Sequence, residues 1–231
     1  MIIPAYNESK NIKLVVENII NNYPQYDYVI VNDGSQDDTA AICYKNNYNI
    51  IDLPVNLGIG GAVQCGYIYA YQNDYDISVQ IDGDGQHDPA YVEKLIKPIT
   101  SGTVDMVVGS RFIERQGFQT SFIRRFGIKL IKSVIKICCG ASITDTTSGF
   151  RAVNKKLIQF FSGEYAQDYP EPEAIVSAVL TGYRVLELPV VMAERSGGVS
   201  SINAVRSVYY MLKVLLALTI CRIGIQKNDK F

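Results

Sequence analysis

Short apolar runs alternate along the chain with segments in which apolar residues recur every three or four positions. The runs are rich in β-branched residues, as buried strands are, and they lie at 1–4, 28–31, 77–81 and 106–108. The segments with helical spacing lie at 12–20, 38–46, 61–73, 89–99 and 122–138. Strands and helices that alternate in this way predict an α/β fold with a mainly parallel central sheet flanked by helices.

The second half of the chain has a less regular pattern. It predicts a polar loop over 145–151, a helix that begins at Glu171, a strand over 183–190 and a long C-terminal helix. No internal repeat, low-complexity tract or linker divides the sequence. We therefore expect one globular domain over 1–201, followed by an apolar and basic helix over 202–231.

Charge and the rarer residue types narrow the chemistry. The net charge of −1 provides no general attraction for nucleic acid. Five cysteines without paired CxxC spacing indicate buried thiols in a reducing compartment, and the chain opens without a basic leader, so we expect a protein that is not secreted. Because His87 is the only histidine, any metal should be a hard cation with oxygen ligands, Mg²⁺ or Mn²⁺.

Polar segments follow the predicted strands, at the positions where parallel sheets bind ligands. The densest follows the 77–81 strand and contains Asp82, Asp84 and Asp88 among glycines. Carboxylates this close repel one another unless a cation compensates them, and Mg²⁺ held by one or two carboxylates and substrate phosphates is the expected solution. The alternative is a solvated acidic turn in which Asp88 caps the next helix.

Three further polar segments occupy equivalent positions. Asp33 can accept hydrogen bonds from a base or ribose, or it can belong to an ordinary turn in which Asp37 or Asp38 caps a helix. Glu8 can likewise reach a nucleotide or complement a helix dipole. The glycines around Gly58 permit close approach of the backbone, although their spacing is not that of a dinucleotide-binding GxGxxG loop.

Together these segments resemble the family 2 glycosyltransferases of GT-A fold, in the branch of the dolichyl- and polyprenyl-phosphate sugar synthases. The resemblance covers about residues 1–202. Its six motifs are PAYNE at 4–8, NDGSQDDT at 32–39, NLGIGGA at 56–62, DGDGQHDP at 82–89, GSRF at 109–112 and DTTSGFRA at 145–152. It implies that residues 1–201 form a GT-A catalytic domain with a Rossmann-like nucleotide-binding half. Asn32 departs from the pattern, because many relatives carry aspartate there.

The resemblance implies a donor site and a metal site. The residues implied to contact the nucleotide sugar, a UDP- or GDP-sugar, are Pro4, Tyr6, Glu8, Asp33, Gly58, Asp82 and Gly83. The implied ligands of Mg²⁺ or Mn²⁺ are Asp82, Asp84 and Gln86. The implied reaction is an inverting displacement at the anomeric carbon, with metal and arginines stabilising the departing nucleoside diphosphate.

Arginines and serines are implied to hold phosphate groups, for which the guanidinium fork is suited. The arginines are Arg111, Arg125 and Arg195, and the serines of the acceptor-phosphate site are Ser148 and Ser200. A solvated helix face is the alternative for Arg125.

The acceptor decides whether the reaction needs a base. An alcohol acceptor requires a carboxylate base, for which Glu171 and Glu173 are the candidates. A lipid phosphate requires none, because the second pKa of a phosphomonoester is about 6 and the group is already anionic near pH 7. The two glutamates would then cap a helix or position the acceptor. The loop over 194–201 resembles the acceptor-side loop of the lipid-phosphate branch and favours polyprenyl phosphate.

The C-terminal segment 202–225 is apolar, but Arg206, Lys213 and Arg222 interrupt it, so it lacks the roughly 20-residue apolar run of a bilayer span. Arg206 and Lys213 share a helix face, as in helices that lie at lipid headgroups; a core-packed helix is the alternative. We expect a cytoplasmic protein attached to the inner face of the cell membrane, directly or through a small membrane protein.

Three functions are consistent with the sequence. The first is transfer of a sugar from a nucleotide sugar to a polyprenyl (undecaprenyl-type) phosphate for cell-surface glycan synthesis. The second is transfer to a hydroxyl of a growing surface polysaccharide. The third is a catalytically silent binding or scaffold subunit, which predicts damaged metal ligands, whereas Asp82, Asp84 and Gln86 are all present.

Overall fold

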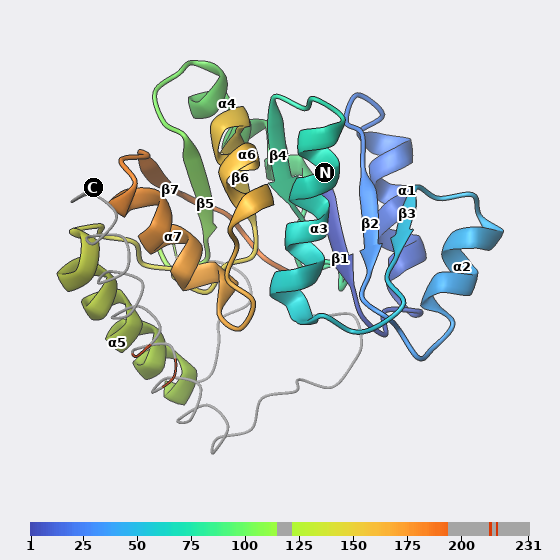
Figure 1. The fold of residues 1–231 in the computed structure, drawn as a ribbon, viewed down its shortest axis with the longest axis horizontal. Coiled ribbons are helices and arrows are strands. Elements are labelled where there is room, and N and C mark those ends of the chain that lie inside the picture. Colours follow the sequence, from blue (N-terminus) through green and yellow to red (C-terminus); the bar gives the residue numbers. More distant parts are fainter. Residues whose placement is uncertain (115–121, 194–212, 214–215, 217–231) are drawn as a thin grey trace.

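A computed structural model describes residues 1–114, 122–193, 213 and 216, without the side chains of 122–126. Within these residues, seven strands form one sheet in the order β3-β2-β1-β4-β6-β5-β7 (Figure 1). The strands are β1 (Ile2–Ala5), β2 (Val29–Asn32), β3 (Ile50–Asp52), β4 (Ile77–Gln80), β5 (Met106–Ser110), β6 (Arg151–Asn154) and β7 (Val185–Pro189). Strand β6 pairs antiparallel with β4 and β5, and all other pairs are parallel. The predicted α/β class and mainly parallel sheet are confirmed.

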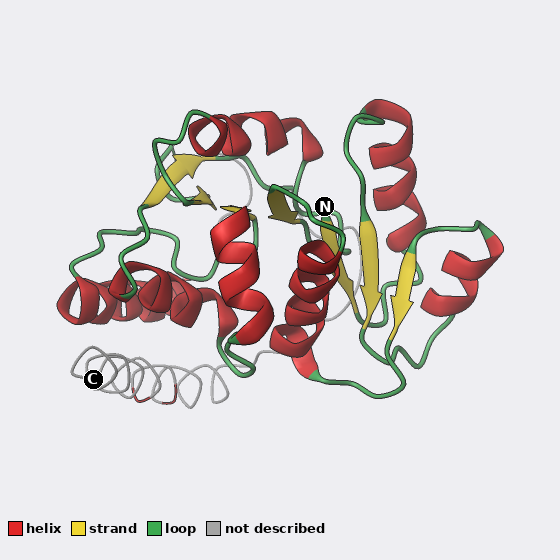
Figure 2. Cartoon of the chain, turned by 45° about the horizontal axis from the view of Figure 1, so that its top comes forward, coloured by secondary structure: helices red, strands yellow, loops and turns green. Residues whose placement is uncertain are grey.

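Helices cover both faces of the sheet (Figure 2). They are α1 (Ile12–Asn22), α2 (Thr39–Lys45), α3 (Gly58–Gln72), α4 (Val92–Thr100), α5 (Phe122–Cys139), α6 (Lys155–Gly163) and α7 (Pro170–Leu180). Successive side chains of a strand point to opposite faces of the sheet. In β5, Met106 and Val108 pack with the layer of α3, α5, α6 and α7, whereas Val107 packs with α4. Helices α1 and α2 pack on residues such as Ile3 and Ile30. Burial on both faces explains why the strands read as continuous apolar runs.

Two predicted helix starts can be compared with the structure. Asp88 accepts a hydrogen bond from the Ala90 N–H at 2.9 Å, as a cap should, and a 3₁₀ turn at Pro89–Tyr91 precedes α4. Helix α3 begins at Gly58, three residues before the predicted start, because the glycines that suggested a loop lie within its first turn.

Strands β3 and β6 and helix α6 were not expected from the sequence pattern. The predicted polar loop over 145–151 ends in β6, a strand of only four residues that opens with a charged arginine. Because β6 runs against its neighbours, its beginning lies at the sheet edge where β1, β2 and β4 end. The loop that precedes β6 therefore meets the loops after those three strands.

An ion pair between Asp105 and Arg184 joins the amino ends of β5 and β7, at the opposite edge of the sheet; its arginine is 57% exposed and its aspartate 14% exposed. The Asp105 carboxylate accepts hydrogen bonds from the Arg184 backbone N–H at 2.9 Å, from Arg184 Nε at 3.0 Å and from Asn154 Nδ2 at 2.9 Å. The hydrogen bonds from Arg184 outweigh burial and lower the pKa of Asp105. An aspartate with a lowered pKa stabilises the fold above its unfolded-state pKa, and this contribution is lost as the pH falls through the folded-state value.

We expect Asp105→Asn to lower the midpoint of thermal unfolding at pH 7 by roughly 2–4 °C, because an amide cannot accept from all these donors. The difference from wild type should shrink as the pH falls below about 4. Thermal melts followed by circular dichroism between pH 3 and pH 7 would measure both effects. Asp76→Asn is the control, because Asp76 faces Lys155 at 3.5 Å on the open surface. An equal loss in both variants would contradict the assignment.

Candidate active site

A cleft of about 680 Å³ lies where β1, β2 and β4 end. It is lined by Pro4, Ala5, Tyr6, Asn7, Glu8, Asp33, Asn56, Gly58, Ile59, Ala62, Asp82, Gly83, Asp84 and Glu171. All seven residues predicted to contact a nucleotide sugar are among them, together with Asp84 and Glu171. The order of the parallel strands brings these residues together, since their carboxyl ends share one edge of the sheet.

The loops after β1 and β2 are joined by hydrogen bonds. Backbone N–H groups of the first loop donate to side chains of the second: Asn7 to Ser35 Oγ at 2.9 Å, Glu8 to Thr39 Oγ1 at 2.9 Å and Ser9 to Asp37 Oδ2 at 3.1 Å. Burial would raise the pKa of Asp37, but hydrogen bonds from Thr39 and Ser9 outweigh it and hold that pKa below its ordinary value. The two loops therefore form one wall of the cleft, which also fixes Glu8.

Asp33 organises the side of the cleft nearest α3. It is 3% exposed; its Oδ1 accepts from the Leu57 N–H at 2.7 Å, and its carbonyl accepts from Asn56 Nδ2 at 3.0 Å. Gly34 has φ +64°, and a Cβ there would lie 2.8 Å from the Asn56 nitrogen, so this turn requires glycine. Asp33 thus fixes the conformation of the loop before α3 through these hydrogen bonds, and it also lines the cleft.

Asn32 departs from the family pattern for a reason that the structure supplies. It is buried, its Nδ2 donates to Asp52 Oδ1 at 2.7 Å, and its Oδ1 accepts from Ser35 Oγ at 2.5 Å. An aspartate here would place a second carboxylate against Asp52 without a donor between them. The amide therefore suits its neighbours, and Asp33 is unaffected by the change.

Asp82, Gly83 and Asp84 form the floor of the cleft. Asp84 is 6% exposed, and its Oδ1 accepts from the Gln86 N–H at 3.0 Å. The Asp82 side chain is 34% exposed and lies on Gly149, where an added Cβ would be 2.9 Å from Asp82 Oδ1. The loop before β6 therefore supports Asp82 from behind.

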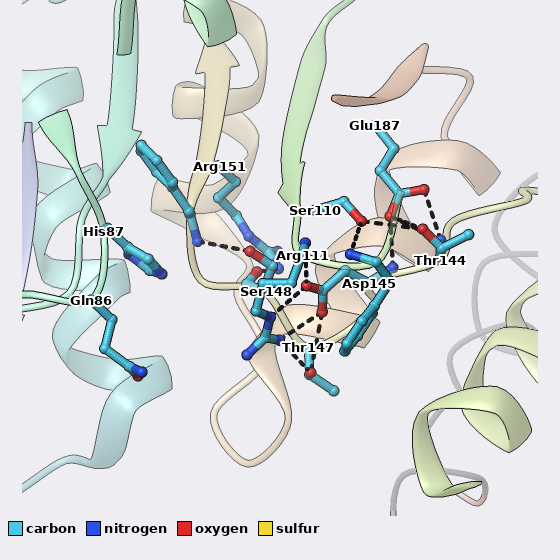
Figure 3. Close-up of polar contacts among 12 residues, drawn as sticks. Gln86, His87, Ser110, Arg111, Thr144, Asp145, Thr147, Ser148, Arg151 and Glu187 are labelled. Carbon is cyan, nitrogen blue, oxygen red and sulfur yellow. Dashed lines mark hydrogen bonds and ion pairs between the residues drawn. The ribbon is translucent and has the colours of Figure 1, made fainter. Parts of the chain in front are cut away.

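His87 and Gln86, labelled in Figure 3, belong to the turn that carries these aspartates, and each contacts a residue outside that turn. His87 Nδ1 accepts from the Asp82 N–H at 3.1 Å, and its ring stacks on Phe150 with centroids 4.8 Å apart. The Nε2 of Gln86 donates to the Ala193 carbonyl at 3.2 Å. The Gln86 side chain, predicted as a metal ligand, is thus also joined to the segment that leads into residue 194.

The two aspartates fit the predicted cation. Among the residues that the structure describes, no three His, Cys, Asp or Glu side chains form a metal-binding cluster. Asp82 and Asp84 both face the cleft, and carboxylate oxygens suit Mg²⁺ and Mn²⁺. This donor set fits a cation whose coordination is completed by substrate phosphates better than one enclosed by protein alone.

Arg111 lies beside the cleft in a buried network and not on the cleft wall (Figure 3). Its Nε and Nη2 each donate to the Asp145 carboxylate at 2.7 Å, and its Nη2 also donates to Thr147 Oγ1 at 3.2 Å. Burial opposes the charge of Arg111, but the bonds to Asp145 outweigh it and raise the pKa of the guanidinium. Asp145 is in turn held by Glu187, which accepts from the Asp145 N–H at 2.6 Å.

The remaining predicted residues are placed as follows. Ser148 is 1% exposed, and its Oγ accepts from the Phe150 N–H at 3.3 Å, so it lies behind the cleft. Glu173, one turn into α7, does not line the cleft; burial, with Asp168 nearby, raises its pKa. Arg125 belongs to α5, but its side chain is not described, and Arg195 and Ser200 lie outside the described residues.

Sequence reasoning missed several residues that build this site. Asp145, Gly149 and Arg151 lie within a motif that was recognised, but no role was assigned to them. Glu187 offered a signal, because it is a charged residue in the apolar run of β7. The pairing of Arg111 with Asp145 joins residues 34 positions apart and has no local pattern.

Comparison with known proteins agrees with this geometry. The family model described as glycosyl transferase family 2 matches residues 1–161, more than half of the chain. The polyprenol monophosphomannose synthase of Mycolicibacterium smegmatis is 27% identical over 224 residues, which cover 93% of this chain and 84% of that protein. The UDP-N-acetylglucosamine–dolichyl-phosphate N-acetylglucosaminyltransferase of Methanococcus voltae is 34% identical over 214 residues, which cover 82% of this chain and 83% of that protein.

A solved structure has the same fold. The glucosyl-3-phosphoglycerate synthase of Mycobacterium tuberculosis, determined in complex with Mn²⁺, UDP and glucosyl-3-phosphoglycerate, superposes with a TM-score of 0.70. It is 20% identical, and the match covers 96% of this chain and 78% of that one. The predicted GT-A fold and the resemblance to polyprenyl-phosphate sugar synthases are confirmed. The chain belongs to glycosyl transferase family 2.

Proposed function

We propose that this enzyme transfers a sugar from a nucleotide-sugar donor to the phosphate of a polyprenyl phosphate, with inversion at the anomeric carbon. The observation that carries the proposal is the cleft, which gathers the predicted donor residues and both aspartates of the DGDG turn. The names of the relatives from Mycolicibacterium smegmatis and Methanococcus voltae support a lipid-phosphate acceptor.

The donor occupies the cleft with its nucleoside near Tyr6, Glu8 and Asp33. Carboxylates suit the N–H groups of a base and the hydroxyls of a ribose. Pro4, Gly58 and Gly83 present backbone or small surfaces, which permit close approach of the donor. Both UDP- and GDP-sugars fit this description.

The diphosphate lies over Asp82 and Asp84. A bound Mg²⁺ or Mn²⁺ would neutralise charge that develops on the departing nucleoside diphosphate. Asp82 and Asp84 would hold it, and Gln86 is the further predicted ligand. The protein's own part is to hold both carboxylates still, through the Gln86 N–H and the His87 contact described above.

The transfer is one displacement. An oxygen of the acceptor phosphate forms a bond to the anomeric carbon while the bond from that carbon to the diphosphate oxygen breaks, and the electron pair leaves with the nucleoside diphosphate. The acceptor phosphate is already anionic near pH 7, so no side chain must remove a proton. Arg111, Arg125, Arg195 and Ser200 are proposed to neutralise and orient the phosphates, whereas Ser148, buried behind the cleft, is proposed to act only through the loop to which it belongs. Arg111 is pre-oriented for this by its fork to Asp145.

A hydroxyl acceptor is the second candidate, because Glu171 lines the cleft and could act as a base. Glu173 has a raised pKa, as a base can have, but it does not reach the cleft wall. The relatives' names favour the phosphate acceptor over this alternative.

Helix α5 supports attachment of the enzyme to a membrane surface. The helix sequence contains five basic and no acidic residues. Among its described side chains, the exposed positions follow the helical repeat and form one face, made of Lys129, Leu130, Ser133, Lys136 and Ile137. Basic and aliphatic side chains on one helix face suit an anionic lipid surface. No helix among the described residues is long and apolar enough to cross a bilayer. A small membrane protein remains a proposed further partner.

Asp84→Asn should lower kcat/KM by roughly 100-fold or more and weaken Mn²⁺ binding in the presence of UDP or GDP, because one metal ligand loses its charge. Turnover is measured with radiolabelled nucleotide sugars and polyprenyl phosphate, and metal binding by electron paramagnetic resonance of free Mn²⁺. Asp88→Asn is the matched control in the same turn, since asparagine also caps helices. Unchanged turnover of Asp84→Asn would contradict the role of Asp84 as a metal ligand.

The acceptor can be identified from the product and from Glu171→Gln. A sugar attached through phosphate should be released by mild acid, whereas an ordinary glycoside should survive. With a phosphate acceptor, Glu171→Gln should keep kcat within about tenfold of wild type, because no base is needed. Loss of a general base would instead cost about 10²–10⁴-fold. An acid-stable product together with that larger loss would establish the hydroxyl acceptor.

Reversing the charge of α5 should weaken membrane binding. The double variant Lys129→Glu and Lys136→Glu is expected to bind vesicles of anionic phospholipid at least about tenfold less tightly at low salt, since each lysine near such a surface contributes about 1 kcal/mol. Sedimentation with vesicles measures this, and high salt should reduce the difference. Lys13→Glu with Lys45→Glu, on α1 and α2, is the control. Equal binding by both double variants would rule out α5 as the contact.

A further inference from the structure

Arg151, the first residue of β6, is a fully buried cation behind the cleft. Its side chain is 0% exposed, in a central strand that pairs with β4 on one side and β5 on the other. Among the described residues, no carboxylate forms an ion pair with it, unlike Arg111 with Asp145. An unpaired buried charge is costly, and an apolar side chain of similar volume would pack at lower cost. A contribution to the stability of the fold therefore does not explain why a charged arginine is buried at position 151.

The guanidinium of Arg151 connects two segments that are far apart in sequence. Its Nη2 donates to the Ser148 carbonyl at 2.5 Å, and its Nη1 donates to the Glu171 carbonyl at 3.2 Å. The first carbonyl belongs to the loop before β6, and the second to the first turn of α7 (Figure 3 shows Arg151 beside Ser148). One side chain thus fixes both segments.

Each of these segments reaches the cleft. The peptide that contains the Ser148 carbonyl leads directly into Gly149, where an added Cβ would lie 2.9 Å from Asp82 Oδ1. On the other side, Glu171 itself lines the cleft. Movement of the Arg151 guanidinium would therefore shift the supports of Asp82 and Glu171 together.

Two residues with unpartnered polar atoms face each other across the β4–β6 pair. Within the described part of the chain, the buried side-chain atoms without a hydrogen-bond partner are Gln80 Oε1, Thr146 Oγ1 and Arg151 Nε. Gln80 lies directly opposite Arg151 in the β4–β6 pair, and its Nε2 donates to Asp82 Oδ1 at 3.3 Å. Buried polar atoms are normally satisfied, and exceptions concentrate where function requires them.

The charges of Arg151, Asp82 and Glu171 also act on one common side chain, Tyr165. Burial of its hydroxyl raises the pKa of Tyr165 well above the ordinary value; among smaller influences, Arg151 lowers it, while Glu171 and Asp82 raise it. The cation and the two carboxylates therefore act on one common region.

We propose that Arg151 is a positioning residue of the donor site: its buried guanidinium fixes the supports of Asp82 and Glu171 and supplies positive charge behind them, so that Asp82 is set to bind a divalent cation with a nucleoside diphosphate. This inference rests on the proposed function. Arg151 touches neither donor nor acceptor and acts through the Ser148–Gly149 peptide and the first turn of α7.

The test compares Arg151→Met, which removes charge and hydrogen bonds, with Arg151→Lys, which keeps the charge. Binding of Mn²⁺ in the presence of UDP, and separately GDP, is followed by electron paramagnetic resonance. Arg151→Met should weaken Mn²⁺ binding about 10- to 100-fold, the usual cost of losing a residue that orients a metal ligand, and Arg151→Lys should recover part of it. The Mn²⁺ concentration for half-maximal turnover should rise in parallel, and saturating Mn²⁺ should restore most of the turnover.

Arg184→Met is the control, because it loses an arginine bonded to Asp105 at the far edge of the same sheet. It should unfold more easily yet bind Mn²⁺ as wild type does. If Arg151→Met does not fold, Gly149→Ala tests the same link, since its Cβ would press on Asp82 while Arg151 stays in place. It should also weaken Mn²⁺ binding.

The outcomes separate this inference from the proposed function. Folded Arg151→Met or Gly149→Ala that binds Mn²⁺ and nucleotide like wild type would overturn the positioning role and leave the proposed function intact. If the wild-type protein fails to bind Mn²⁺ both in the presence of UDP and in the presence of GDP, the proposed function is overturned and this inference with it.

Discussion

Five carboxylates line one cleft in this protein, and their mutual repulsion is the constraint that the surrounding structure must satisfy: Glu8, Asp33, Asp82, Asp84 and Glu171. Four of them accept hydrogen bonds from neutral N–H groups: Glu8 from Asn11 Nδ2 at 2.7 Å, Asp33 from the Leu57 N–H, Asp82 from Gln80 Nε2 and Asp84 from the Gln86 N–H. Neutral donors orient a carboxylate but do not cancel its charge. Carboxylate oxygens are the ligands that hard divalent cations take together with substrate phosphates, and this chemistry is the basis of the proposed metal site.

The sheet topology brings the supports of this cleft together. Three parallel strands end at its edge, and the antiparallel strand β6 begins there. If β6 ran parallel to β4, the loop before it would lie at the opposite edge, and neither Gly149 nor Arg151 could stand behind Asp82. In the part of the chain that the structure describes, β6 is the one strand that runs against its neighbours, and this reversal brings residues 145–151 to the edge of the cleft.

The sequence predicted the parts of the molecule that have a local pattern. Apolar runs buried on both faces identified β1, β2, β4 and β5, and the polar residues after them correctly indicated the cleft. Residues such as Asp33 and Asp82 could be found because position after a strand determines position in the cleft. Strand β6 could not, because four residues that start with Arg151 carry no strand pattern. The pairs Arg111–Asp145 and Asp145–Glu187 depend on tertiary packing alone.

Two buried arginines, Arg111 and Arg151, lie close to the cleft and differ in their hydrogen-bond partners, and this difference decides how much of each charge is balanced locally. Arg111 shares a fork of hydrogen bonds with Asp145, so a carboxylate at hydrogen-bond distance balances most of its charge. Arg151 binds only backbone carbonyls among the described residues, so its charge is not cancelled locally. In a medium of low dielectric that charge extends further than it would in water. Of the two, Arg151 keeps its charge without a described carboxylate at hydrogen-bond distance, whereas Arg111 is paired with Asp145 and also interacts with the more distant charges of Asp82 and Glu171, which help to raise its pKa.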